Sequence, residues 1–266
     1  MVSQFIDETT FEKREENHWY GHLNENWNIG NVPNGGYLLA VVLRAMKQQT
    51  TFSDLLSASA HFLRPGNIKA ESEVEAVLLK EGNSISTCEG SMIQEQKLAL
   101  KVVAEFGNLE IKNNDSRNFE IEPPILPPPE KCSERSSASQ GIELPIRRRV
   151  EVRIAEMESD SQKAEVYGWI RFCDSTEPDS LALALFSDAF PPSIFSRLGR
   201  LGWVPTVQLS VQIRKFPTEG WLAGHFYTDD FQNGSTIETG RLWDSTGSLV
   251  AQSRQLALVK NKATRE

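Results

Sequence analysis

The order of helical and alternating segments constrains the fold of this chain most, because the same order occurs twice. Residues 34–46 predict an apolar helix. It is followed by a strand that ends before Gly66 and then by three further segments of alternating pattern. A second apolar helix is predicted at 179–190. Two strands precede it and four follow, at 206–216, 221–229, 235–244 and 249–259. Each half therefore predicts one helix followed by an antiparallel meander.

Matching residues give this repeat a spacing. Gly82 and Gly234 begin similar turns 152 positions apart, and Pro65 and Pro217 end strands at the same spacing. A common spacing at separate landmarks indicates two copies of one unit. The expected fold class is α+β, with two tandem units that each wrap a curved antiparallel sheet around a long central helix.

The units are expected at residues 1–110 and 146–266, with an initial strand and loop over residues 1–30. Residues 111–145 contain paired prolines and serines, which predict an extended linker without packed elements.

Composition limits the partners of the chain. The formal net charge of −8 over 266 residues argues against nucleic acid. No apolar run is long enough for stable membrane insertion, and no secretory signal is recognisable, so a cytoplasmic location is expected. The three cysteines show no metal or redox spacing, and the histidines form no metal pair, so neither a metal nor a cofactor is expected.

Asp188 is the first candidate for chemistry. It is the carboxylate near the end of a helix that is otherwise apolar on nearly all sides. A carboxylate in such surroundings must be hydrogen-bonded, paired or raised in pKa, and a raised pKa suits a general base. The alternative is that Asp188 caps the chain locally or reaches solvent past Pro191.

Glycines at the start of the first helix and two polar strand residues complete the candidate set. The N–H groups near Gly35 and Gly36 favour an oxygen or anion, although the glycines could instead serve only close packing. Thr206 begins a strand in which every second residue is polar. The residues 152 positions earlier, in the first half, are mostly apolar, so this face of the strand is expected to be either reactive or directed outward. Gln255 lies among small residues, opposite in the repeat to Val103.

These residues resemble the acyl-CoA thioesterase II family of double-hotdog enzymes. The resemblance is carried by Phe62-Leu63-Arg64-Pro65-Gly66, Glu81-Gly82-Asn83-Ser84-Ile85-Ser86, Ser187-Asp188 and Thr206. It implies hydrolysis of acyl-CoA to free fatty acid and CoA, in fatty acid metabolism, by a homo-oligomer. It implies that Asp188 activates a water that Thr206 and Gln255 orient. Gly35, Gly36 and Tyr37 would bind substrate or stabilise the oxyanion.

Two further readings stay open. One is a non-catalytic acyl or lipid-binding protein, and the other is an enoyl-CoA hydratase, which the absence of histidine from both predicted helices disfavours. Candidate basic groups for the anionic CoA are Arg147-Arg148-Arg149, Arg64 and Arg214-Lys215, each of which could equally be an ordinary solvated edge.

Overall fold

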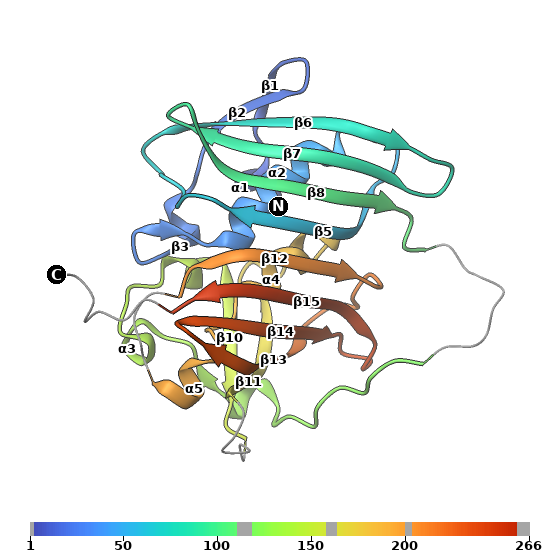
Figure 1. Ribbon diagram of the computed structural model, residues 1–266. Helices are drawn as coiled ribbons and strands as arrows, with labels where there is room; N and C mark the ends of the chain where they lie inside the picture. Colours follow the sequence, from blue (N-terminus) through green and yellow to red (C-terminus); the bar gives the residue numbers. More distant parts are fainter. Residues whose placement is uncertain (1–2, 111–118, 158–163, 200–203, 260–266) are drawn as a thin grey trace.

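A computed structural model describes residues 3–110, 119–157, 164–199 and 204–259 (Figure 1). The first half contains α1 (Gln4–Thr9), β1 (Glu12–Glu15), β2 (His18–His22), η1 (Glu25–Trp27), β3 (Asn28–Ile29), β4 (Val32–Pro33), α2 (Gly35–Lys47), β5 (Asp54–Phe62), β6 (Glu71–Glu81), β7 (Ser86–Gln94) and β8 (Lys97–Gly107). The remainder contains η2 (Pro129–Lys131), β9 (Ser133–Glu134), α3 (Ser137–Gln140), η3 (Pro145–Arg148), β10 (Val150–Ala155), β11 (Ala164–Phe172), α4 (Ser180–Phe186), α5 (Phe195–Leu198), β12 (Thr206–Ile213), β13 (Leu222–Gln232), β14 (Ser235–Trp243) and β15 (Leu249–Leu258).

One antiparallel sheet of 13 strands runs through both halves, in the order β1-β2-β6-β7-β8-β5-β12-β15-β14-β13-β11-β10-β9. At its centre β5 pairs with β12, where Ala60 lies opposite Leu209 (Figure 1). The halves are therefore joined by backbone hydrogen bonds as well as by the chain. No helix within the described ranges is long and apolar enough to cross a membrane.

Helices α2 and α4 pack against each other on one face of this sheet. The 13-residue α2 begins at Asn34, whose side chain accepts a hydrogen bond from the Tyr37 N–H. The second helix predicted at 179–190 is too long, because α4 has only seven residues. The N–H groups of Asp188 and Ala189 bond to carbonyls three residues back, at 3.0 and 3.3 Å, and these tight turns end the helix before the prolines.

Two other predictions from the sequence are wrong. Residues 1–30 begin with a helix rather than a strand, because Ser3 caps α1 and Phe5 is buried in the core. The region predicted as a linker without packed elements contains β9, α3 and short 3-10 turns. Its proline-rich backbone is held by two indole N–H groups, from Trp169 to the Pro127 carbonyl and from Trp243 to the Ile121 carbonyl.

Matching β-bulges relate the two halves. Extra residues interrupt the pairing at Leu56 and Val207, at Ala99 and Val250, and at Leu79 and Asp229. The members of these pairs are 151, 151 and 150 positions apart, so the expected spacing of 152 is wrong within the strands. A shift of one residue exchanges the two faces of a strand. The corrected spacing places Thr206 with Leu55, Gln255 with Ala104 and Glu238 with Cys88.

An ion pair between the halves holds α1 in place. The Glu8 carboxylate accepts hydrogen bonds from Arg149 Nε at 2.6 Å and Nη2 at 2.5 Å, and from the indole N–H of Trp27 at 2.7 Å. The side chains of Glu8 and Arg149 are 13% and 15% exposed, so removal of the cation would leave a carboxylate poorly solvated. Arg149 is therefore occupied within the fold.

We expect Arg149→Met to lower the free energy of unfolding by about 2–4 kcal/mol, because it leaves the carboxylate of Glu8 without its cation. Chemical denaturation measures this loss. The neighbouring Arg148, which is exposed and donates to the side chain of Asn26, is the matched control. Arg148→Met should change stability by less than about 0.5 kcal/mol. Equal losses in both variants would contradict a specific role for Arg149.

Candidate active site

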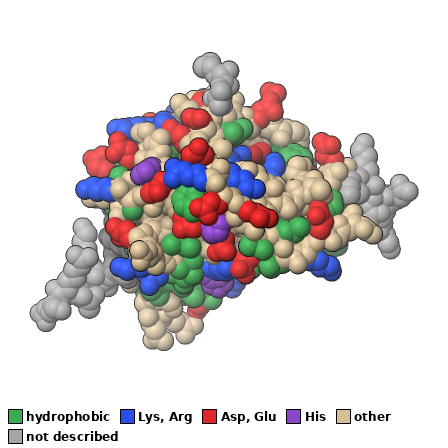
Figure 2. All heavy atoms as spheres, turned by 90° about the horizontal axis from the view of Figure 1, so that it is seen from above, with side chains coloured by type: hydrophobic (Ala, Val, Ile, Leu, Met, Phe, Trp, Pro, Cys, Tyr) green, Lys and Arg blue, Asp and Glu red, His purple; other side chains and the backbone are tan. Residues whose placement is uncertain are grey.

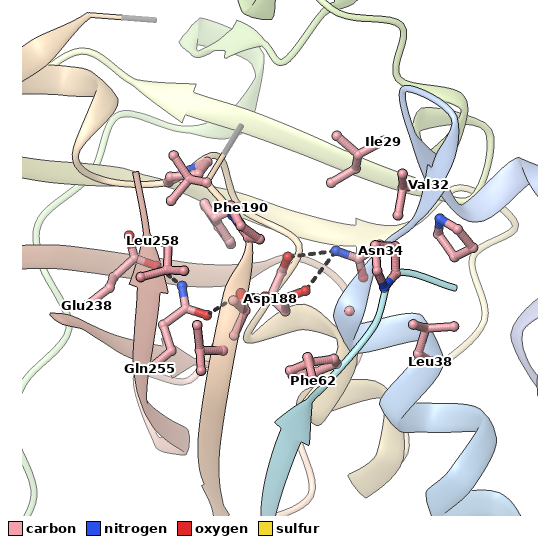
Figure 3. A pocket seen from close by; sticks show the side chains of 18 of the residues that line it. Ile29, Val32, Asn34, Leu38, Phe62, Asp188, Phe190, Glu238, Gln255 and Leu258 are labelled. Atoms are coloured by element: carbon pink, nitrogen blue, oxygen red, sulfur yellow. Dashed lines mark hydrogen bonds between the residues drawn. The ribbon is translucent and has the colours of Figure 1, made fainter. Parts of the chain in front are cut away.

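The carboxylate of Asp188 lies two residues after α4, where the start of α2 meets it (Figure 3). The Gly36 N–H donates to Oδ2 at 2.8 Å, and Asn34 Nδ2 donates to the same oxygen at 2.9 Å. Asn34 Nδ2 also lies 2.9 Å from the Asp188 carbonyl oxygen. The N-terminus of α2 therefore holds one oxygen of the carboxylate, as a helix N-terminus favours an anion.

Gly35 and Gly36 have no room for a side chain, because the end of α4 lies directly against them. A Cβ atom at Gly36 would lie 2.7 Å from the Leu185 carbonyl oxygen, and one at Gly35 would lie 2.9 Å from Asp188 Oδ2. The sequence left open whether these glycines allow close packing or present N–H groups to an oxygen. Here they do both: α2 packs closely against the end of α4, and the Gly36 N–H binds Asp188 Oδ2.

Thr206 and Gln255 extend the contacts from the other carboxylate oxygen. Thr206 Oγ1 lies 3.3 Å from Asp188 Oδ1 and 3.1 Å from Gln255 Oε1. Gln255 Nε2 in turn donates to Glu238 Oε1 at 2.8 Å (Figure 3). The structure therefore brings the three residues predicted for the reaction into one hydrogen-bonded chain.

The bulge at Val207 turns Thr206 toward this chain. Thr206 pairs opposite the buried Ala257, whereas Gln208 pairs opposite the exposed Leu256. The prediction that Thr206 and Gln208 share one face is therefore wrong, because the extra residue reverses the alternation between them. The polar residues after Thr206 on this strand lie on the outer face.

Burial raises the pKa of Asp188 from its ordinary 3.8 to about 6. Hydrogen bonds from Gly36, Thr206 and Asn34 favour the ionised form and limit this rise. The positive charge of Arg135 acts in the same direction. The carboxylate is thus partly buried and titrates near neutral pH, which suits a general base.

Arg135 comes from the region predicted as a linker, and sequence reasoning missed it. Its side chain is 4% exposed, and burial lowers its pKa to about 10. Nη1 donates to the Ala189 carbonyl, and Nε donates to Gln140 Oε1 at 2.6 Å. Nothing in the sequence pattern places this arginine beside Asp188, because a proline-rich segment lacks the periodicity that sets a face.

Asn34 and Glu238 were also missed. Asn34 is the first residue of the predicted helix, and an asparagine at a helix start is the ordinary signal of an N-cap. Glu238 follows a strand alternation like many solvated glutamates, and only the tertiary structure buries it, at 6% exposure.

The side chain of Tyr37 packs within the fold, and only its backbone N–H lies at the start of α2 near the candidate site. The ring stacks on Trp27 at 5.2 Å, and its hydroxyl donates to the Glu8 carbonyl at 2.9 Å. Burial raises the pKa of this hydroxyl well above its usual value. The described residues contain no group of three His, Cys, Asp or Glu side chains that could hold a metal.

Asp188, Thr206 and Gln255 line an open cavity of about 1760 Å³. Much of its lining is apolar and comes from both halves, including Ile29, Val32, Leu38, Phe62, Phe190 and Leu258 (Figure 3). This lining suits a hydrocarbon chain with one polar end at the carboxylate.

Solved structures first define the fold class. A protein from Alicyclobacillus acidocaldarius described as having a hot dog fold superimposes with a TM-score of 0.86, at 23% identity over 99% of this chain and all of that one. An acyl-CoA thioesterase II from Mycobacterium marinum gives a TM-score of 0.78 at 17% identity, over 98% of this chain and all of that one. The chain has a hotdog fold.

Sequence comparisons are more specific. Residues 23–107 match the family model of the acyl-CoA thioesterase N-terminal domain, and residues 124–259 match that of the C-terminal domain. A candidate thioesterase II from Thermobifida fusca is 28% identical, with a TM-score of 0.85 over 97% of this chain and 98% of that one. An uncharacterized protein from Mycobacterium bovis is 26% identical over 90% of each chain. The chain belongs to the acyl-CoA thioesterase family and is a thioester hydrolase, which confirms the resemblance.

Asp188→Asn should stabilise the protein at alkaline pH. Because the pKa of Asp188 is higher in the folded state, its contribution to stability is complete below about pH 4 and is lost as pH rises through about 6. A neutral amide oxygen can still accept from Gly36 and Asn34. We expect the free energy of unfolding to rise by about 1–3 kcal/mol at pH 8, and much less near pH 4. Denaturation curves at both pH values measure this, and unchanged or lower stability at pH 8 would contradict it.

Proposed function

We propose that Asp188 is the general base that activates water for attack on an acyl-CoA thioester, with Thr206 and Gln255 orienting that water. The observation that carries this proposal is the hydrogen-bonded chain of Asp188, Thr206 and Gln255 in the wall of the largely apolar cavity. An acyl chain would lie along the apolar lining, which leaves its thioester carbonyl beside the carboxylate.

Hydrogen counting favours a water at this position. The hydroxyl of Thr206 has one proton but two acceptors within reach, Asp188 Oδ1 and Gln255 Oε1. Each of these oxygens has two lone pairs, so a water can donate one proton to each of them, whichever of the two accepts from the hydroxyl. Asp188 then takes the proton while the water oxygen bonds to the thioester carbon. Collapse of the tetrahedral intermediate breaks the C–S bond, and the proton returns to the departing CoA sulfur.

The start of α2 would stabilise the oxyanion. The Gly36 N–H already donates to Asp188, so its first role is to hold the base. Gly35 lines the cavity, and its N–H makes no backbone hydrogen bond to a described residue. We assign the oxyanion contact to this N–H, supported by the positive end of the helix dipole. Tyr37 contributes by its backbone hydrogen bond to Asn34 Oδ1, at 3.1 Å.

Arg64 fits the anionic part of CoA best among the predicted basic residues. It is exposed at the cavity, and Nη1 donates to the Leu98 carbonyl at 2.6 Å. Arg147, Arg149 and Lys215 instead form ion pairs with glutamates. Basic and acidic side chains are interspersed on the face that Figure 2 shows, so charge there does not gather into one sign.

The chain organisation follows from the same proposal. Residues 1–110 and 146–266 would be two hotdog units in tandem, joined by residues 111–145, with the base on the second unit and the helix N-terminus on the first. The matched bulges support this division. A homo-oligomer and a cytoplasmic location stay predictions. The described cavity lining contains no histidine, which gives no support to the hydratase reading.

Asp188→Asn should lower kcat/KM for acyl-CoA hydrolysis by about 10²- to 10⁴-fold, because the general base is removed. Thiol release from acyl-CoAs of increasing chain length measures the loss and also sizes the cavity. Asp229→Asn, on the exposed bulge of β13, is the matched control and should retain activity. A wild-type rate in Asp188→Asn would contradict the assigned base. Ligand-induced stabilisation without turnover in the wild type would instead favour a binding protein.

Thr206→Ala and Gln255→Ala should each lower kcat/KM by about 10- to 100-fold, since each removes one hydrogen bond to the same water. The double variant should lose much less than the product of the two factors, because the water is already released by the first change. A double-mutant cycle on thiol release tests this, with Thr206→Ser as the variant that keeps a hydroxyl. Independent, multiplicative losses would argue against a shared water.

A further inference from the structure

Glu238 is a buried carboxylate in direct contact with Gln255. It lies on β14 and lines the cavity (Figure 3). Its Oε1 accepts from Gln255 Nε2 at 2.8 Å, and its Oε2 accepts from the Ser193 N–H at 2.6 Å. Each oxygen is thus held by a neutral donor, and one of these donors is a fixed backbone group.

This contact decides which way the Gln255 amide points. An amide has one donor end and one acceptor end, and Gln255 Nε2 is the end that donates to Glu238 Oε1. The NH₂ group of Gln255 therefore faces Glu238. The carbonyl Oε1 is left facing Thr206, whose Oγ1 lies 3.1 Å away.

We propose that Glu238 is a positioning residue for hydrolysis, which fixes the Gln255 amide so that its oxygen accepts a proton of the attacking water. This rests on the proposed function, in which that water lies between Gln255 and Asp188. With acceptors on both sides, the two O–H bonds of the water point to protein oxygens. A lone pair then points toward the thioester carbon.

The first half of the chain provides an independent comparison. At the spacing set by the matched bulges, Glu238 and Gln255 correspond to Cys88 and Ala104, and both of those residues are fully buried. Burial of a carboxylate costs folding free energy that only its hydrogen bonds offset, so a buried glutamate in one half and not in the other indicates a role beyond packing. Glu238 thus occurs in the same half as the polar residue that it orients, and an apolar side chain takes the place of each in the other half.

Glu238 also affects the charge at the site. Burial raises the pKa of Glu238 first, and the nearby negative charge of Asp188 raises it further. At Asp188 itself, the positive charge of Arg135 lowers the pKa.

Glu238→Gln tests the proposal with little change in shape. The Ser193 N–H is fixed and takes the oxygen of the new amide, so the new NH₂ faces Gln255 and turns its amide over. We expect kcat for thiol release to fall about 10- to 100-fold with KM little changed.

An exchange of the two groups should restore activity in part. In Glu238→Gln with Gln255→Glu, the carboxylate at position 255 accepts from the amide at 238 and again presents an oxygen toward Thr206. We expect kcat several-fold above that of Glu238→Gln alone. Gln255→Glu by itself places two carboxylates in contact, so it should be less active than the exchanged pair.

Glu165→Gln is the matched control, since this half-buried carboxylate of β11 bonds the Tyr167 hydroxyl and does not line the cavity. It should keep the wild-type kcat. Wild-type kcat in Glu238→Gln, or an exchanged pair no better than that single variant, would overturn the role of Glu238. If Asp188→Asn also kept the wild-type rate, the proposed function itself would fail. Loss of activity in Asp188→Asn alone would leave that function standing without Glu238.

Discussion

The hydrogen bond from the Gly36 N–H to Asp188 is the contact that the rest of the site requires. It joins the first turn of α2 to the chain after α4, so both halves of the sequence must be in place before the carboxylate is held. Any side chain at Gly36 would strike the Leu185 backbone. The two helices can approach this closely because Gly35 and Gly36 have no side chains. The cavity and the polar residues of the strands lie around this contact.

Burial at this point has opposing effects. It removes water from Asp188 and raises its pKa, which makes the carboxylate a better proton acceptor near neutral pH and a less favourable group to fold around. Neutral donors hold the carboxylate, and the nearby positive charge of Arg135 lowers its pKa only in part. An ion pair with the carboxylate would lower the pKa further and leave a weaker base.

The sequence predicted Asp188 as a candidate more readily than the residues around it. A lone carboxylate in an apolar helix, a Gly-Gly helix start and a polar residue opening a strand are local signals, and they predicted Asp188, Gly36 and Thr206. The extent of the second helix was misjudged because tight turns before prolines look helical in composition. The predicted faces of the strands were wrong because a β-bulge adds one residue to a strand and the alternation of polar and apolar residues does not show where it occurs. Arg135 and Glu238 reach the site only through contacts between distant segments, which local periodicity does not encode.

The central pairing of β5 with β12 has a consequence for symmetry. When two identical chains form such a sheet, every substitution appears on both sides of the axis, and a polar group that serves one site is imposed on the other. Here both halves belong to one chain. Leu55 and Thr206 can therefore differ, and so can Ala104 and Gln255. One side can keep a dry, close-packed interior while the other carries polar groups in the cavity, a division of labour that a pair of identical subunits could not reach.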